Sequence, residues 1–93
     1  MLSVTDAAAA MIDQLVDEAG AAAAAGLRLT HEQGSHALLM GLTDHPERDD
    51  EVLAVPGAHA PVYLDPEVVA RVGNAVLDVK REPGAAAFFL RED

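Results

Sequence analysis

Two histidines on either side of a short polar turn form the arrangement in this sequence that is best suited to binding a metal ion. His31 and His36 flank the turn Glu32–Ser35. If this turn closes a β-hairpin, the two imidazoles lie opposite each other, with Cβ atoms about 4.5–5.5 Å apart. They could then share an iron or zinc ion, to which Glu32 would add a carboxylate oxygen. The alternative, favoured because no third protein ligand is evident, is two exposed polar residues beside a turn.

Other kinds of reactive site are not indicated. The chain contains no cysteine, which excludes disulfides, thiolate catalysis and a zinc ion or iron–sulfur cluster held by its own cysteines. Ser3 and Ser35 lie in no nucleophile motif, and no glycine-rich phosphate loop or metalloprotease motif occurs. The acidic run 44–51, which includes His45, lacks the ligand spacing and glycine of a calcium loop and indicates a solvated loop. We therefore predict that the protein is not an enzyme.

The charge of the chain narrows the range of partners. Sixteen acidic residues against six basic ones give a formal net charge of −10. Such a surface repels phosphate backbones and anionic membranes, and aromatic residues on which bases could stack make up only 3% of the chain. We predict binding to neither nucleic acid nor membrane. The acidity would suit a basic partner or a cation, although solubility alone explains it.

Length and hydropathy are typical of one small domain spanning residues 1–93. No apolar run approaches the roughly 20 residues of a membrane-spanning helix. No lysine or arginine precedes Arg28, so the basic region of a signal peptide is missing. The expected location is therefore the cytoplasm.

The hydrophobic pattern predicts a helix near the N-terminus, before the two histidines. Thr5 or Ser3 can cap it, and Gly20 is a plausible end. Between these residues, apolar side chains recur on one helical face at Ala8, Ile12, Leu15, Val16 and Ala19.

After Gly26 the period changes to two, which predicts strands. Residues 27–30 and 38–42 form the hairpin that carries the histidines, and further short strands follow at 52–55, 62–64, 75–79 and 86–90. Asp65 followed by Pro66 is a strong helix start, so a short helix follows the strand 62–64. The expected fold is α+β and mainly β: a small β-sandwich of mixed or antiparallel strands with an N-terminal helix and one short helix.

The last predicted strand carries both phenylalanines of the chain. Phe88 and Phe89 point to opposite faces of a strand, so one is expected in the core and the other in a second layer or a contact patch. A C-terminal strand at an open sheet edge would be a natural surface for a homodimer or another protein partner.

Taken together, three stretches resemble the HesB/IscA-like iron–sulfur biosynthesis domain, that is, the A-type cluster carriers. The first is VTDAAAAMIDQLVDEAG, similar to the opening helix of that family. The second is GLRLTHEQGSHALLMGLTDHP, similar to its hairpin. The third is PVYLDPEVVARVGNAVLDVKREPGAAAFFL, in which Asp65 and Asp78 match two aspartates of the family and Phe88 matches a late phenylalanine.

The resemblance implies a β-rich fold that readily forms dimers and a role in cluster assembly or delivery. In the family, one cysteine lies in the hairpin loop, at about residues 33–35 here, and two lie in a C-terminal Cys-Gly-Cys motif, whereas this chain stops at Asp93. No cluster ligand can be matched, so a cluster is not expected. The predicted function is a non-catalytic interaction or accessory module of iron–sulfur metabolism. The alternative is a His/carboxylate protein that binds iron or zinc through His31 and His36, which flank the same loop.

Overall fold

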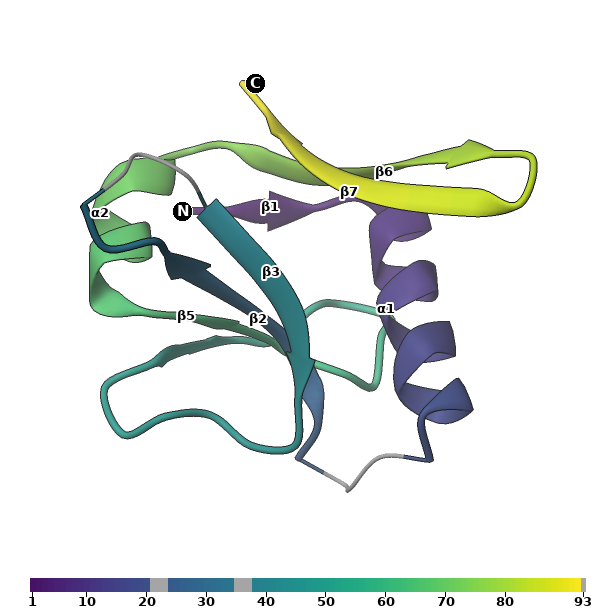
Figure 1. The fold of residues 1–93 in the computed structure, drawn as a ribbon, viewed down its shortest axis with the longest axis horizontal. Helices are drawn as coiled ribbons and strands as arrows, with labels where there is room; N and C mark the ends of the chain where they lie inside the picture. The colour runs from purple at the N-terminus through teal and green to yellow at the C-terminus, as the bar shows by residue number, and fades with distance from the viewer. Residues whose placement is uncertain (21–23, 35–37, 93) are drawn as a thin grey trace.

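The computed structural model describes residues 1–20, 24–34 and 38–92. Within them the chain forms, in order, β1 (Ser3–Val4), α1 (Asp6–Glu18), β2 (Gly26–His31), β3 (Leu38–Thr43), β4 (Glu51–Leu53), β5 (Val62–Leu64), α2 (Pro66–Val72), β6 (Val76–Glu82) and β7 (Ala85–Arg91) (Figure 1). This order confirms the predicted α+β fold with a longer N-terminal helix and one short helix.

The strands form two sheets, one with the order β3-β2-β5-β4 and the other with the order β1-β6-β7. The β2–β5 and β1–β6 pairs are parallel, and the remaining pairs are antiparallel, so the sheets are mixed as predicted. Apolar side chains of both sheets and both helices share one core. Its largest fully buried members are Ile12, Leu29, Val62, Val68 and Leu77.

Helix α1 begins where the sequence predicts. The Thr5 hydroxyl accepts a hydrogen bond from Ala8 N at 3.1 Å and caps the first turn. Of the predicted apolar face, Ala8 and Ile12 are completely buried and Val16 packs against the core, whereas Ala19 lies beyond the helix end and is exposed. The helix ends at Glu18, just before Gly20 at φ 61°.

The β2–β3 hairpin confirms the period-two pattern. Leu27 and Leu29 of β2 are buried, whereas Arg28 and Thr30, which alternate with them, are half-buried on the other face. Gly26 is required at the start of β2, because a Cβ atom there would overlap the carbonyl oxygen of Pro61.

Strands β3 and β4 are the opposite edges of their sheet, so residues 44–50 must cross the sheet face over β2 and β5. This loop is the charged segment expected from the sequence. It covers the outer face, on which Tyr63 of β5 is only 3% exposed. The Tyr63 hydroxyl also donates a hydrogen bond to the backbone oxygen of Ala24.

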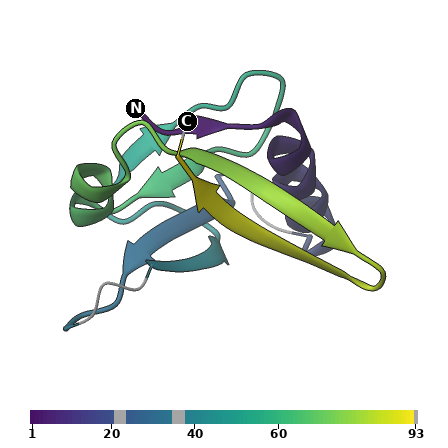
Figure 2. The ribbon, with the colours of Figure 1, turned by 90° about the horizontal axis from the view of Figure 1, so that it is seen from above.

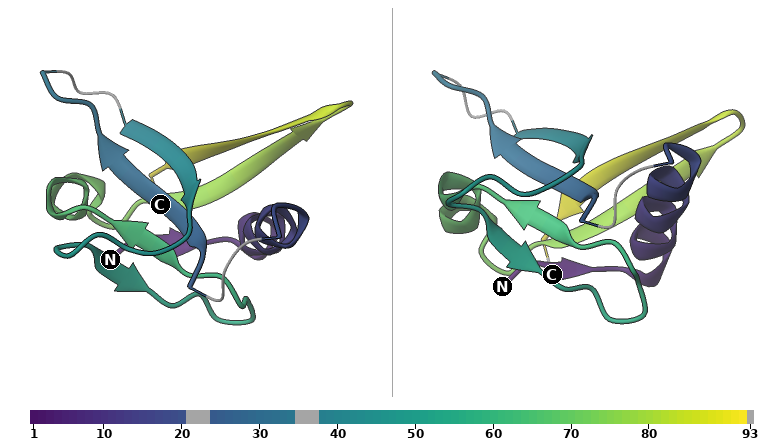
Figure 3. Two further views of the ribbon diagram at one scale, coloured as in Figure 1. Left: turned by 60° about the horizontal axis from the view of Figure 1, so that its bottom comes forward. Right: turned by 90° about the horizontal axis from the view of Figure 1, so that it is seen from below.

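The β6–β7 hairpin extends beyond the rest of its sheet. Strand β1 pairs only with Val76 and Leu77, whereas the β6–β7 pairing continues to Glu82 and Ala85. In Figures 2 and 3 these two strands therefore project past α1 as a two-stranded ribbon.

Candidate functional site

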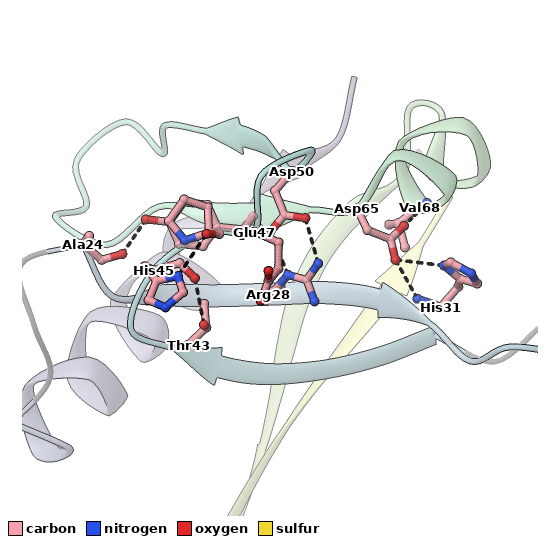
Figure 4. A network of polar contacts seen from close by, with 11 residues as sticks. Ala24, Arg28, His31, Thr43, His45, Glu47, Asp50, Asp65 and Val68 are labelled. Atoms are coloured by element: carbon pink, nitrogen blue, oxygen red, sulfur yellow. Dashed lines mark hydrogen bonds and ion pairs between the residues drawn. The ribbon is translucent and has the colours of Figure 1, made fainter.

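The predicted histidine site lies where β2 ends, beside the start of α2. Because β2 and β5 run parallel with Leu29 paired to Leu64, Asp65 after β5 comes next to His31 at the end of β2. Figure 4 shows the His31 ring and the Asp65 carboxylate pointing toward each other. Two residues 34 positions apart in the sequence thus share one hydrogen-bonded cluster.

The His31 ring lies between two carboxylates. Its Nδ1 atom is 2.8 Å from Asp65 Oδ2, and its Nε2 atom is 3.1 Å from Glu67 Oε2. Arg71 lies on the far side of Glu67, with its guanidinium nitrogen 3.4 Å from the same oxygen. A neutral imidazole carries one N–H, so His31 can donate to both carboxylates only as an imidazolium.

Asp65 is the centre of this cluster. Its Oδ1 atom accepts from Val68 N at 2.8 Å and caps α2, as the Asp65–Pro66 pair predicts. Its Oδ2 atom also accepts from the backbone N–H of His31 at 3.2 Å. Burial, the largest single influence, raises the pKa of Asp65, but the hydrogen bonds from Val68 and His31 together outweigh it and leave the pKa below its ordinary value.

The structure changes the geometry expected for a metal at this place. The hairpin register pairs His31 with Leu38, so the prediction that His31 faces His36 across the hairpin was wrong in register. The expectation for this hairpin was a loop of four residues or slightly more, and β3 begins only at Leu38, while His36 itself lies outside the described residues. Glu32 is exposed. Across residues 1–20, 24–34 and 38–92, no three His, Cys, Asp or Glu side chains are placed to hold a metal ion together.

The same ring does not form a hydrolytic dyad. An Asp–His pair activates a nucleophile when the second ring nitrogen faces a hydroxyl or thiol. Here the second nitrogen faces the carboxylate of Glu67. The contacts of His31 therefore join β2 to α2 and provide no general base for a neighbouring nucleophile.

A second ion pair, which the sequence does not signal, attaches the loop 44–50 to the sheet. Arg28 on β2 binds Asp50 with two hydrogen bonds, Nε to Oδ2 at 2.7 Å and NH2 to Oδ1 at 2.8 Å. The Asp50 side chain is 1% exposed, and its Oδ2 atom also accepts from Glu47 N at 2.9 Å. The hydrogen bonds from Arg28, ahead of that from Glu47, lower the pKa of Asp50.

Asp78, the second aspartate of the resemblance, joins β6 to Thr5, the residue that follows β1 and caps α1. It accepts from Thr5 Oγ1 at 2.9 Å and from Val79 N at 2.8 Å, and Arg91 Nε lies 3.4 Å away. The hydrogen bond from Val79, followed by that from Thr5, lowers the pKa of Asp78. The threonine that caps α1 is therefore itself fixed to β6.

Asp13 of α1 has a similar role that the sequence did not indicate. Its carboxylate accepts the backbone N–H groups of His59 at 3.0 Å and Ala60 at 2.7 Å. Nothing in its local sequence marks it, because the two donors are 46 and 47 residues away.

Several large apolar side chains remain exposed. They are Met1, Leu39, Leu42, Val52, Val69 and Phe89. Phe88 packs against the core, so the expected division of the two phenylalanines is confirmed, with Phe89 on the outer face of β7 and 39% exposed. No helix among the described residues is long and apolar enough to cross a membrane.

The fold is that of A-type carriers. The chain superposes on SufA of Escherichia coli, involved in the biosynthesis of iron–sulfur clusters, with a TM-score of 0.78 at 24% identity over 97% of this chain and 83% of SufA. A protein from Aquifex aeolicus superposes with a TM-score of 0.74 at 24% identity, over 99% of this chain and 91% of the Aquifex protein. The structure of IscA with a [2Fe-2S] cluster superposes with a TM-score of 0.66 at 18% identity, over 98% of this chain and 81% of IscA. No protein-family model and no curated protein matches the chain. These superpositions confirm the predicted HesB/IscA-like fold.

The side chains of this protein do not fit the cluster that such a fold implies. Protein iron–sulfur clusters are bound mainly through cysteine thiolates. The 93 residues contain none, and both ring nitrogens of His31 already face carboxylates. The chain thus combines the carrier fold with a donor set unsuited to a cluster.

Proposed function

We propose that this protein is a non-catalytic interaction or accessory module of iron–sulfur cluster biogenesis that does not itself carry a cluster. The observation that carries the proposal is the pairing of an A-type carrier fold over 97% of the chain with a complete lack of cysteine. A fold with no cluster ligand still presents the outer surfaces through which a carrier meets other proteins. The partner is another protein or a second copy of this chain.

Cluster reconstitution tests the first half of this function. The protein is incubated anaerobically with Fe(II) and sulfide, desalted, and assayed for bound iron and for the visible absorbance of a cluster. We expect neither, because the chain supplies no thiolate. Stoichiometric iron and sulfide with cluster absorbance would refute the proposal.

Cluster transfer tests the second half. A loaded [2Fe-2S] carrier and a cluster-free acceptor are mixed with and without this protein, and transfer is followed by visible circular dichroism. An accessory module is expected to change the transfer rate while remaining free of iron after re-isolation. A transfer rate unaffected at excess protein, without complex formation by sedimentation, would count against the proposal.

The second candidate is a His/carboxylate protein that binds iron or zinc through His31 and His36, with Glu32 as a further ligand. Its support is the position of His31 at the base of the loop, in contact with two carboxylates. Calorimetric titration with Fe(II) and Zn(II) tests this candidate, with His31→Ala and His36→Ala as the decisive variants. Binding that survives both substitutions would dismiss the site.

A further inference from the structure

A groove lies between strand β4, the first residues of the chain and helix α2. Strand β4 is an edge of its four-stranded sheet and β1 is an edge of the other sheet. In both views of Figure 3 the start of the chain lies beside β4. Two adjoining cavities of about 320 and 350 Å³ occupy this place, and Met1, Leu2 and Leu53 line both of them. They therefore form one continuous groove along β4.

Exposed apolar side chains gather at this groove. Met1 is 76% exposed, Val52 57% and Val69 36%, and all three line it. The floor beneath them is apolar as well, because it includes Leu2 and Leu64, each 4% exposed. Single apolar side chains on a protein surface need no explanation, but several gathered over an apolar floor are typical of a binding site.

The backbone of Val52 is directed toward the open edge of β4. Asp65 N donates to Leu29 O, so Asp65 directs its backbone toward β2. Backbone direction alternates along a strand, so Leu64 faces β4 and exchanges hydrogen bonds with its partner Glu51. Val52, the next residue of β4, therefore directs its N–H and C=O away from β5. An added strand can pair with these two groups.

The end of the groove at which β4 begins is acidic. Glu51 lines it, is exposed, and forms no ion pair with any residue in the described part of the chain. The α-amino group of Met1, which is also at the groove, is already bound to Asn74 Oδ1 at 2.6 Å. The chain as a whole has a net charge of −10. These charges favour a basic group in the occupant and disfavour a second copy of this acidic chain.

We propose that this groove binds a short extended segment of a different protein, which adds an antiparallel strand to β4 and carries a lysine or arginine. The segment residue that faces Val52 exchanges two backbone hydrogen bonds with it. The side chains before and after that residue point into the groove, the first beside Leu53 and the second beside Glu51. The expected segment is therefore apolar, then β-branched, then basic. Because β4 has only three residues, the pairing is short.

A pair of synthetic peptides tests the added strand. The first is the fluorophore-labelled peptide acetyl-Ser-Leu-Val-Lys-Ser-amide, and its binding to the whole protein is followed by fluorescence anisotropy. The second is identical except for N-methylation of its valine, which removes the N–H that donates to Val52 O. It should bind at least roughly tenfold more weakly than the first. Equal binding of both peptides, or no saturation up to about 1 mM protein, would overturn the proposal.

Two substitutions, each with a matched control, test the site on the protein. Glu51→Lys should raise the dissociation constant of the first peptide roughly tenfold through repulsion of its lysine. Glu18→Lys is the control, because it makes the same change of charge at an exposed position on α1 that does not line the groove. Val69→Gln should also weaken binding, whereas Leu39→Gln, at a 50% exposed position on β3, should not. Equal effects of each variant and its control would overturn the site.

The biological meaning of this groove rests on the proposed function, whose partner class it names, and the two can fail separately. No peptide binding by a protein that still alters cluster transfer would overturn the groove and leave the function intact. Peptide binding as expected, together with a cluster gained on reconstitution, would refute the function and leave the groove intact. Self-association that Val69→Gln weakens and the first peptide reverses, measured by sedimentation, would identify a second copy as the occupant and overturn the proposal.

Discussion

Substitution of Asp65 should divide its effect on stability into two parts. Its carboxylate caps α2 through Val68 N and holds His31 through both the ring and the backbone N–H. An N-cap contributes about 1 kcal/mol. Hydrogen bonds to a charged acceptor contribute about 1.5–3 kcal/mol, and the residue is only 8% exposed. Asp65→Ala should therefore lower the free energy of unfolding by about 3 kcal/mol.

Asp65→Ser separates the two parts. Serine caps a helix as well as aspartate does but is too short to reach the His31 ring. The free energy of unfolding of this variant should therefore fall by about 2 kcal/mol, while the cap contribution of about 1 kcal/mol is retained. For a domain of this length the total is only roughly 5–14 kcal/mol, so both losses are measurable. Urea unfolding followed by far-ultraviolet circular dichroism suits a chain with no tryptophan and one tyrosine. Asp44→Ala, at an exposed loop position, is the control. Equal losses in the serine and alanine variants, or losses below about 0.5 kcal/mol, would refute the assignment.

Three further predictions concern the loop, the pH response and the start of β2. Asp50→Asn should destabilise the fold by about 2 kcal/mol and free the loop, so trypsin should cleave after Arg48 faster than in the parent; unchanged cleavage would contradict the ion pair. The folded-state pKa values of Asp50 and Asp65 lie below their ordinary value of 3.8, so their stabilisation is complete above that value and is lost as pH falls through the lower folded-state values. The urea concentration at the unfolding midpoint should decline below about pH 4 in the parent protein, and less steeply in Asp50→Asn. Identical pH profiles of the two proteins would contradict this prediction. Gly26→Ala should destabilise by about 3 kcal/mol because its Cβ overlaps a backbone carbonyl, whereas Gly41→Ala, with open space at its Cβ, should stay within about 0.5 kcal/mol; thermal melts that do not separate the pair would refute the steric argument.

Local signals were sufficient to predict most elements of this fold. Thr5 and the Asp65–Pro66 pair mark helix starts through hydrogen bonds made within three residues, and both caps are present. The strand 62–64 was predicted with its observed ends, and the β2–β3 hairpin follows from its alternation. Strand ends elsewhere shifted by a few residues. For instance, β6 continues to Glu82 because pairing with β7 extends it beyond the apolar run.

The contacts that build the candidate site are not local, and this is why the sequence did not reveal them. Parallel pairing of β2 with β5 places Asp65 beside His31, and an edge-to-edge loop places Asp50 beside Arg28. Each contact depends on the order of strands, which period-two alternation does not specify. The histidine pair was inferred by assuming that the turn Glu32–Ser35 closes the hairpin. The observed pairing of His31 with Leu38 does not agree with that turn length.

The carrier fold in this protein depends on no thiol. Its helices are capped by Thr5 and Asp65, its outer loop is held by the Arg28–Asp50 pair, and the cap of α1 is joined to β6 through Asp78. These groups are hydroxyls, carboxylates and a guanidinium on the scaffold, and the core between the sheets is aliphatic. A cluster site on such a scaffold can be absent without removing any interaction that maintains the strand order. The groove beside β4 is built by the same scaffold and is likewise independent of the cluster ligands.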